Sequence, residues 1–450
     1  MAVTQGTLNK AYVSAISLLD QRDINPNLID VARDAQFTDI MKVVNRYKET
    51  KVPTYNHFVN NDVFATAVIS SVSSGYGTSR MTVVLTAATG GYARVGDLVR
   101  ISNTNSIGRS ARIMTVTSVS SVDTIVLQSV DNTPLFAATN DQITFQSNAF
   151  SEKSDTPASR RYPVTRYVNQ VQVFREADEI TDIQKVSKIE ISINGQPYYT
   201  PLQHIYKLKA LNGFISAQMI AGVQSTTLFS DSNPILADSG NPIQTTMGLD
   251  QYITTYGISD QVASLGTVGF SDVDDLIDNF LANKAPLDQL GWLGSKARRP
   301  WDVWLKNLGS SGVNSVRLVI DGREVDLMVD RFSYGNATFE FVHLPIFDHP
   351  QLFPLGIVPE MVGSTYFTPK DKVQVEGGGM EARLQIRYLP KPMAGGSSVS
   401  TGSNGIITEW STGALAPIPT SSLMVWHVDW YTNQGLEVLG AKHMQRFRVV

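Results

Sequence analysis

The sequence contains no cysteine in its 450 residues. This absence excludes a disulfide scaffold and any zinc or iron–sulfur site with thiolate ligands. The sequence also lacks a run approaching the roughly 20 consecutive apolar residues that span a bilayer. Residues 1–6 show neither the basic start nor the apolar run of a signal peptide. We therefore expect no membrane segment and a protein that folds in a cytoplasm.

Charge is scarce as well. Basic residues number 37 and acidic residues 41, and charged residues make up 17% of the chain, against roughly 25% in a typical soluble domain. The missing basic excess disfavours a protein that binds nucleic acid mainly through electrostatics. Hydrophobic residues make up 42%, which excludes a disordered chain. So little charge on so long a chain suggests a surface that is covered by partners.

Catalytic motifs are missing too. The sequence has no Gly-Lys pair for a phosphate-binding loop, no His-Glu-x-x-His zinc helix and no Gly-x-Ser-x-Gly elbow. His343, Asp348 and His349 form the best group of histidines and carboxylates, and we interpret them as a polar loop. The acids that follow Ser271 favour the positive end of a helix dipole rather than a metal. We expect no enzyme, no cofactor and no metal site.

The N-terminal region, residues 7–50, has helical periodicity. Tyr12, Ile16 and Leu19 fall on one stripe. Because the region has too few apolar residues for a domain of its own, we interpret it as a set of short helices on an arm.

Residues 63–147 are rich in Ser, Thr, Val and Gly, and short β-branched runs recur between glycines. This spacing predicts a small antiparallel barrel or sandwich. An oligonucleotide-binding barrel is the alternative, and it is disfavoured because the stretch has few aromatic residues and little basic excess.

The strongest local signal is a capping box at residues 200–203, with proline at the first helical position. An apolar stripe follows as far as Gly222, which predicts one amphipathic helix of about 30 Å. Residues 223–260 look rich in loops, and Ser271 is expected to cap a second helix that runs through Asn283. The pair Asp321-Gly322 predicts a hairpin turn.

Three tryptophans, Trp292, Trp301 and Trp304, lie near Arg298 and Arg299 in the sequence. One interpretation of these tryptophans is a sugar-binding platform, which would require exposed rings. Buried rings with a cation–π contact are the interpretation that we favour.

The order of these segments resembles the major capsid protein of tailed bacteriophages, which has the Johnson fold shared with herpesvirus shells. The most specific stretch is Arg166-Tyr167-Val168-Asn169-Gln170-Val171-Gln172-Val173-Phe174. It is similar to the Asn-x-x-Gln-x-Phe stretch that returns from the extended loop in one subgroup of that family.

The resemblance implies an α+β Johnson-fold subunit with an N-terminal arm, an extended loop carrying a small β module, a peripheral domain with a long spine helix, and an axial domain. The expected parts are the helical arm at 1–60, the inserted β module at 61–150, the return strands of the extended loop at 151–196, the spine helix at 197–235, the axial domain and peripheral strands at 236–380, and C-terminal strands with a Gly/Ser loop at 381–450.

The resemblance also implies assembly of the chain with itself into pentamers and hexamers, in a virion shell that encloses double-stranded DNA without sequence-specific contact. Portal, scaffolding and auxiliary capsid proteins are the other partners that it implies. The alternative is another structural protein, such as a tail, baseplate or adhesin component; an enzyme ranks third. The expected inter-subunit contacts are Tyr12, Ile16, Lys153, Arg160, Arg161, Arg166, Asn169, Gln172 and Phe174.

Overall fold

The structure is a computed structural model, and the chain in it forms two compact units. We call Met1–Tyr55 with Val168–Val450 the body, and Asn56–Tyr167 the barrel unit. The structure describes residues 37–43, 46–60, 66–86, 93–106, 109–119, 122–157, 164–182, 192–193, 196–197, 202–225, 243–263, 266–310, 317–320, 323–326, 331–354, 356–375, 379–390, 399–400, 406–416, 419 and 422–449.

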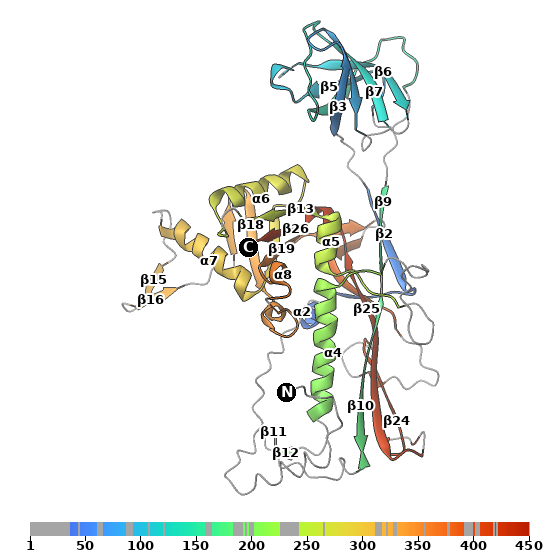
Figure 1. Ribbon diagram of the computed structural model, residues 1–450, viewed down its shortest axis with the longest axis vertical. Helices are drawn as coiled ribbons and strands as arrows, with labels where there is room; N and C mark the ends of the chain where they lie inside the picture. Colours follow the sequence, from blue (N-terminus) through green and yellow to red (C-terminus); the bar gives the residue numbers. More distant parts are fainter. Residues whose placement is uncertain are drawn as a thin grey trace. The chain divides into compact units, whose positions relative to one another are not determined.

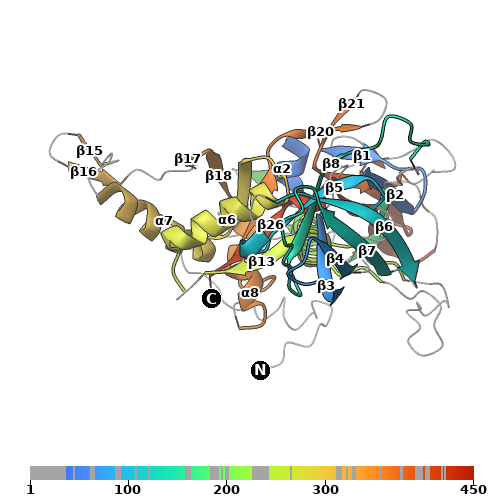
Figure 2. The ribbon, with the colours of Figure 1, turned by 90° about the horizontal axis from the view of Figure 1, so that it is seen from above.

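The barrel unit is built around a closed barrel with the strand order β3-β4-β7-β6-β5-β8 (Figures 1 and 2). Alternate residues of each strand point inward, as on β4, where Met81, Val83 and Leu85 are buried. The predicted barrel is therefore confirmed. Its strands are β3 (Thr66–Ser74), β4 (Arg80–Leu85), β5 (Asp97–Ile101), β6 (Ala111–Val119), β7 (Val122–Ser129) and β8 (Gln142–Asn148).

Two further strands precede and follow the barrel in the sequence. β2 (Thr54–Asn60) and β9 (Val164–Gln170) pair as a two-stranded sheet. The rings of His57 and Tyr167 stack on it, with centroids 5.2 Å apart. The chain therefore leaves for the barrel and returns from it on neighbouring strands.

The first sheet of the body has the order β1-β22-β25-β24-β23, with β10 paired to β25. The long helix α4 lies along it in Figure 1 and buries Leu211, Ile215 and Met219 in a shared apolar core. The elements are β1 (Tyr47–Glu49), β10 (Gln172–Thr181), α4 (Leu202–Ala221), β22 (Leu384–Tyr388), β23 (Val399–Ser400), β24 (Thr408–Thr412) and β25 (Val425–Val438).

The second sheet of the body has the order β13-β26-β19-β14-β18-β17. The helices α6 and α7 cover one of its faces and share an apolar core with it. Trp301 lies at the centre of that layer, with its ring centroid 5.2 Å from those of both Phe341 and Phe447. The elements are β13 (Ile258–Val262), α6 (Phe270–Ala282), β14 (Asp288–Leu293), α7 (Ser295–Ser310), β17 (Arg331–Tyr334), β18 (Ala337–His343), β19 (Ser364–Pro369) and β26 (Gln445–Arg448).

Short elements complete the body. The hairpin predicted from Asp321-Gly322 is confirmed by the pairing of Ile320 with Arg323, while the two turn residues themselves lie outside the described residues. These elements are α2 (Phe37–Val43), β11 (Ser192–Ile193), β12 (Gln196–Pro197), α5 (Leu249–Tyr256), β15 (Arg317–Ile320), β16 (Arg323–Asp326), α8 (Pro359–Val362), β20 (Lys372–Val375) and β21 (Gly379–Ala382). The described 3₁₀ turns are η3 (Pro345–Asp348) and η4 (Ala441–His443) in the body, and η2 (Thr104–Ser106) in the barrel unit.

The predicted long helix is confirmed as α4, with 20 residues. Two expectations hold only in part. The region 223–260, expected to be rich in loops, contains α5. In the region 7–50, expected to be helical, α2 is a helix as expected, β1 is instead a strand that pairs with β22 from far along the chain, and residues 7–36 lie outside the described residues. A third difference concerns α6, which is capped by Gly269 rather than by Ser271. The Asp272 carboxylate there accepts a hydrogen bond from the Gly269 amide at 2.8 Å.

Candidate inter-subunit surfaces

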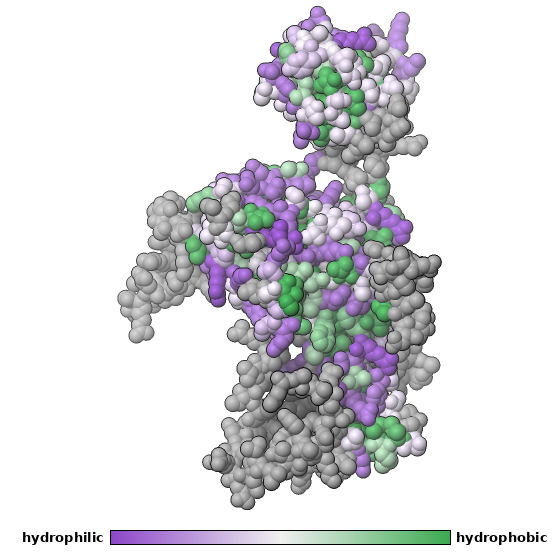
Figure 3. Space-filling view, in the orientation of Figure 1, coloured by the Kyte–Doolittle hydropathy of each residue, from purple (hydrophilic) through white to green (hydrophobic). Residues whose placement is uncertain are grey.

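An apolar groove of about 340 Å³ lies between α4, β10 and the segment 352–358. Figure 3 shows apolar residues gathered over this part of the body. Phe214 stands at the groove with 53% of its surface exposed, and the nearby Ile357 is 78% exposed. The groove is lined by Gln172, Phe174, Phe214, Ala217, Gln218, Ala221, Leu352, Phe353 and Val358.

Two predicted contact residues, Gln172 and Phe174, lie in the wall of this groove. The Gln172 side chain accepts a hydrogen bond from the Thr246 amide at 3.2 Å, which holds it in place. Phe174 is 7% exposed and belongs to the apolar core. Phe174 therefore supports the wall of the groove from the core and exposes little of its own surface.

Asn169 is buried inside the body, with 1% of its surface exposed. Its amide nitrogen donates to the carbonyl of Leu436 at 2.7 Å and to that of Met247 at 3.2 Å. Its oxygen accepts from the amide of Met247 at 2.9 Å. Burial gives this side chain an internal role, in which it joins β9 to β25 and to the segment before α5, in place of the inter-subunit contact expected from the sequence.

Two other predicted contact residues are on the surface. Lys153 is exposed, and so is Arg166, whose guanidinium can donate to the Asn56 side-chain oxygen at 2.7 and 3.1 Å. The remaining four, Tyr12, Ile16, Arg160 and Arg161, lie outside the described residues.

The face of the first sheet that points away from α4 carries charge. Arg175 lies 3.1 Å from the carboxylate of Asp429 and 5.5 Å from the ring centroid of Trp410. His427 lies 3.3 Å from the same carboxylate. Asp429 is directly opposite Trp410 and lies diagonally across from Arg175, whose direct partner is Tyr431, so the three side chains form one cross-strand cluster.

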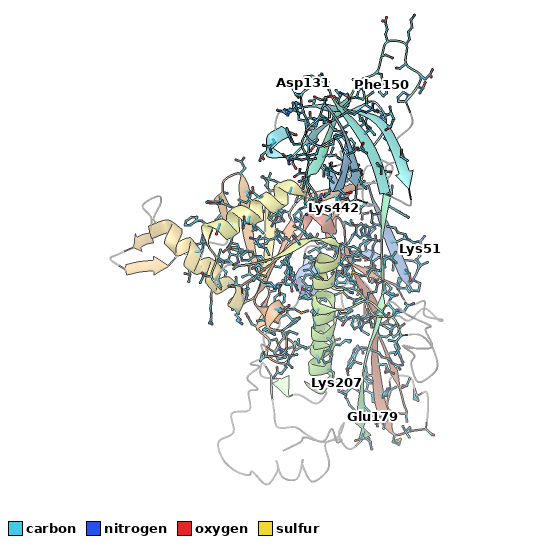
Figure 4. The ribbon with its side chains drawn as sticks, turned by 45° about the horizontal axis from the view of Figure 1, so that its top comes forward. Lys51, Asp131, Phe150, Glu179, Lys207 and Lys442 are labelled. Atoms are coloured by element: carbon cyan, nitrogen blue, oxygen red, sulfur yellow. The ribbon has the colours of Figure 1, made fainter. Side chains whose placement is uncertain are left out.

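The α4 side of the same sheet is tied by a different contact. Lys207 of α4 lies 2.9 Å from the carboxylate of Asp178, which is fully buried on β10. Figure 4 labels Lys207 on α4 and Glu179 on β10, next to Asp178 in the chain. Successive residues of a strand point to opposite faces, so one face of β10 anchors the helix while the other remains open.

A partly buried ion cluster joins α5 to the second sheet, with Asp250 and Arg446 buried and Asp260 exposed. Arg446 donates to Asp250 at 2.7 Å and to Asp260 at 2.7 Å, and the Tyr366 hydroxyl donates to Asp250 at 2.9 Å. Burial, together with the nearby Asp250 carboxylate, raises the pKa of Tyr366 well above its ordinary value. Tyr366 therefore stays a hydrogen-bond donor, and the cluster has the complete pairing that buried charge requires.

His343, Asp348 and Ser295 meet at the start of α7. The Nε2 atom of His343 lies 2.8 Å from Asp348 and 3.1 Å from the Ser295 hydroxyl. A catalytic triad needs the acid and the nucleophile on different ring nitrogens. Here both use Nε2. The Ser295 amide also donates to Asp348 at 2.9 Å, so the group holds the helix start in place.

The three tryptophans are buried, as predicted from the sequence, with exposed fractions of 4% or less. The cation–π contact is made by Arg298, but over the ring of Phe341, at 4.9 Å from its centroid. In the part of the chain that the structure describes, no three metal-ligating side chains gather into a site. No described helix is both long and apolar enough to cross a membrane.

No protein-family model matches the sequence, and no curated protein matches it. Several solved structures are similar in arrangement at low sequence identity. The capsid of the native GTA particle has a TM-score of 0.40 at 8% identity, over 99% of this chain and 100% of that one. The capsid structure of cyanophage P-SCSP1u has a TM-score of 0.38 at 9% identity, over 97% and 94%.

A third similar structure is the holo-SrpI encapsulin complex from Synechococcus elongatus PCC 7942, with a TM-score of 0.36 at 10% identity, over 97% of this chain and 95% of that one. The resemblance stated from the sequence, to phage capsid proteins, points to the same class of structures. Likenesses of this size establish no shared function.

The sequence did contain a signal for the groove. Phe214, Ala217 and Ala221 recur at steps of three and four residues, which places them on one stripe of α4. That stripe lies beside the buried stripe from which the helix was predicted. The other wall, formed by Leu352 and Val358, gives no such periodic signal.

Proposed function

We propose that the chain is the shell-forming subunit of a tailed-bacteriophage capsid, and that it assembles into pentamers and hexamers that enclose double-stranded DNA. The observation that carries the proposal is the open apolar groove on α4 in a chain with only 17% charged residues. Contiguous apolar surface of this kind typically marks a protein–protein contact. The centres of such contacts are also poor in charge.

The proposed occupant of the groove is the N-terminal arm of a neighbouring copy. Tyr12, Ile16 and Leu19 form an apolar stripe at helical spacing. An amphipathic helix that lays such a stripe into an apolar groove is a common mode of recognition. Each subunit would then hold the next, and contact area rather than disulfides would stabilise the shell.

The other proposed partners are portal, scaffolding and auxiliary capsid proteins, and the proposed location is the virion shell. The net charge of −4 provides no basic excess to attract phosphates, which supports a shell that encloses DNA without binding it tightly. Lys153, Arg160, Arg161 and Arg166 remain proposed contacts at the return from the barrel unit.

The direct test is assembly of the purified chain, followed by negative-stain electron microscopy and gel filtration. Closed polyhedral particles are the expected result. Discrete trimers or spikes would favour a tail, baseplate or adhesin component instead. A monomer at all concentrations would contradict self-assembly.

The arm can be tested by deleting residues 1–31. A deletion reaching residue 50 would remove Phe37 and Met41, which are fully buried in the body core, together with β1. The shorter deletion leaves these elements intact, so the truncated chain should stay folded by circular dichroism yet form no particles. Particles of normal size would show that the arm is dispensable.

The absence of cysteine allows a sharper experiment. A chain with Ile16→Cys, carrying a size tag, is mixed with a chain with Ala217→Cys and oxidised. A disulfide between the two chains is expected, because Ala217 lines the groove. In the matched control, the second chain carries Val303→Cys in place of Ala217→Cys. Val303 is 54% exposed on α7 and lies outside the groove. Equal crosslinking in both mixtures would contradict docking of the arm in the groove.

A further inference from the structure

The barrel has two distinct rims. Every neighbouring pair of its strands is antiparallel, so β3, β5 and β7 end at the rim where β4, β6 and β8 begin. The chain enters β3 and leaves β8 at the opposite rim. We call the described loop residues 75–79, 102–106, 109–110 and 130–141 the distal rim, because these loops lie at the end away from both chain connections.

The three loops of the distal rim are fastened to one another. The Gly77 amide donates to the Leu135 carbonyl at 2.9 Å. The Ser106 hydroxyl both donates to the Phe136 carbonyl and accepts from the Phe136 amide, each at 2.8 Å. The Asn103 amide donates to Asp141 at 2.8 Å. A surface that is ordered in advance loses little entropy when it binds a ligand.

An exposed aromatic ring projects from this rim. Tyr76 is 60% exposed and stands between Gly75 and Gly77, which both have the left-handed backbone, at φ +79° and +73°. The Tyr76 ring meets Phe136 edge-on, with centroids 5.4 Å apart. The guanidinium of Arg109 lies 5.8 Å from the centre of the Phe136 ring and donates to the Pro134 carbonyl.

Polar side chains occupy the same rim as the ring. The Asp131 carboxylate is exposed, and hydrogen bonds from Ser129 and Thr133 lower its pKa to about 2, so it is ionised at neutral pH. Short hydroxyls and amides are exposed on the distal rim, at Thr78, Ser102, Thr104, Asn105, Asn132, Thr139 and Asn140, and so are the apolar side chains of Val130, Pro134 and Ala138.

We propose that the distal rim is a carbohydrate-binding site, with Tyr76 as the platform for the apolar face of a neutral sugar and with Arg109 and Asp131 as hydrogen-bonding partners of its hydroxyls. The described rim has one strongly exposed ring, several hydroxyls and amides, a few small apolar side chains, one arginine and two aspartates, Asp131 and Asp141. Such a mixed surface suits a ligand that has both hydroxyls and an apolar face and that carries no negative charge. A nucleic acid would require a basic excess. Residues 66–148 instead contain five arginines and four aspartates, with no lysine and no glutamate.

The loops at one end of small barrels are known positions for oligosaccharide ligands. The inference goes beyond shell formation and does not depend on it, since one unassembled chain carries the complete rim.

The test applies the purified full-length chain to an array of immobilised neutral and anionic oligosaccharides. The strongest ligand is then titrated calorimetrically. Binding to a neutral oligosaccharide is expected, and Tyr76→Ala should weaken it about tenfold or more, which corresponds to about 1.4 kcal/mol. Tyr76→Phe keeps the ring and should retain most of the affinity.

The matched control is Phe58→Ala, which removes an aromatic ring that is 66% exposed on β2, in the same unit but outside the rim. Its affinity for the sugar should be unchanged. The proposal is overturned by an array without binding, or by equal affinities of the original chain and Tyr76→Ala. Tighter binding of a single-stranded oligothymidylate that is lost in Tyr76→Ala would also overturn it, in favour of a nucleic-acid site.

Discussion

The barrel core is aliphatic, with Phe145 as the aromatic side chain in its described cluster, whereas the second sheet of the body is packed with aromatic rings around Trp301. The barrel closes on itself, so its strands pair on both sides. The body instead has two open sheets and an apolar groove. This difference indicates that the barrel is complete within one chain, while the body leaves sheet edges and an apolar groove that the proposed assembly would cover.

The two units can be followed separately. All six tryptophans of the chain lie in the body, at positions 292 and above. Tryptophan fluorescence therefore reports unfolding of the body, and a calorimetric transition without a fluorescence change reports the barrel. Each substitution below is expected to move one transition and to leave the other in place.

The largest effect is expected for Trp301→Ala in the body. The Trp301 ring is fully buried and its indole nitrogen donates to Thr365 at 3.1 Å. Removing it leaves a large cavity, so the free energy of unfolding should fall by about 3–5 kcal/mol. The fluorescence transition should move to a lower temperature. If the barrel transition moved equally, the two units would be one cooperative unit.

Asn169→Ala is expected to cost about 1–3 kcal/mol, because it leaves the Met247 amide buried without its partner and removes one donor from the Leu436 carbonyl, which keeps the Tyr55 hydroxyl. Chemical denaturation followed by tryptophan fluorescence measures the loss. Arg166→Ala, at an exposed position on the same strand, is the control and should change stability by less than about 1 kcal/mol. Similar losses for both variants would contradict the internal role of Asn169.

Gly75→Ala tests the barrel alone. A Cβ atom at this residue would lie 2.1 Å from the Arg80 carbonyl oxygen, and its φ of +79° is strained for alanine. Backbone strain of this kind costs about 1–3 kcal/mol. The calorimetric transition without a fluorescence change should shift downward. Gly379→Ala, where no atom lies within 4 Å of the added methyl, is the control.

The smallest effect is expected from His443 and only in acid. Burial, with the nearby Arg383 and Lys442, lowers the pKa of His443 to about 4. Between pH 4 and the ordinary value of about 6.5 the unfolded chain binds more protons than the folded one, so stability falls as the pH falls through this window. His443→Gln should flatten that dependence in melts followed by tryptophan fluorescence. An unchanged slope between pH 6.5 and 4 would contradict the assignment.

The sequence predicted those elements whose signals are local. The capping box and apolar stripe predicted α4, the Asp321-Gly322 pair predicted the β15–β16 hairpin, and regularly spaced β-branched runs predicted the barrel. In each case a few neighbouring residues specify the backbone.

The elements that the sequence did not predict, β1 and α5, lack such a local signal. β1 is a strand because Tyr47 and Lys48 pair with Ile386 and Arg387, more than 330 residues away. α5 begins at Gly248, which has no side chain for a capping hydrogen bond, so no capping signal marks its start.

For the candidate site, the sequence named Gln172 and Phe174, which line the groove, but gave no sign that Asn169 is buried. Its internal role requires Thr246, Met247 and Leu436 to come together. The groove itself needs the segment at 352–358 beside α4, a contact that no local pattern encodes.

The placement of both chain connections at one rim of the barrel has a consequence for how the chain can change. β2 and β9 are paired, and paired strands lie only about 4.8 Å apart. Any folded module whose own ends are equally close could therefore replace residues 66–148 without rerouting the strands on either side. Such a position suits the exchange of whole modules between related genes, and it suits an engineer who wants to display a foreign domain.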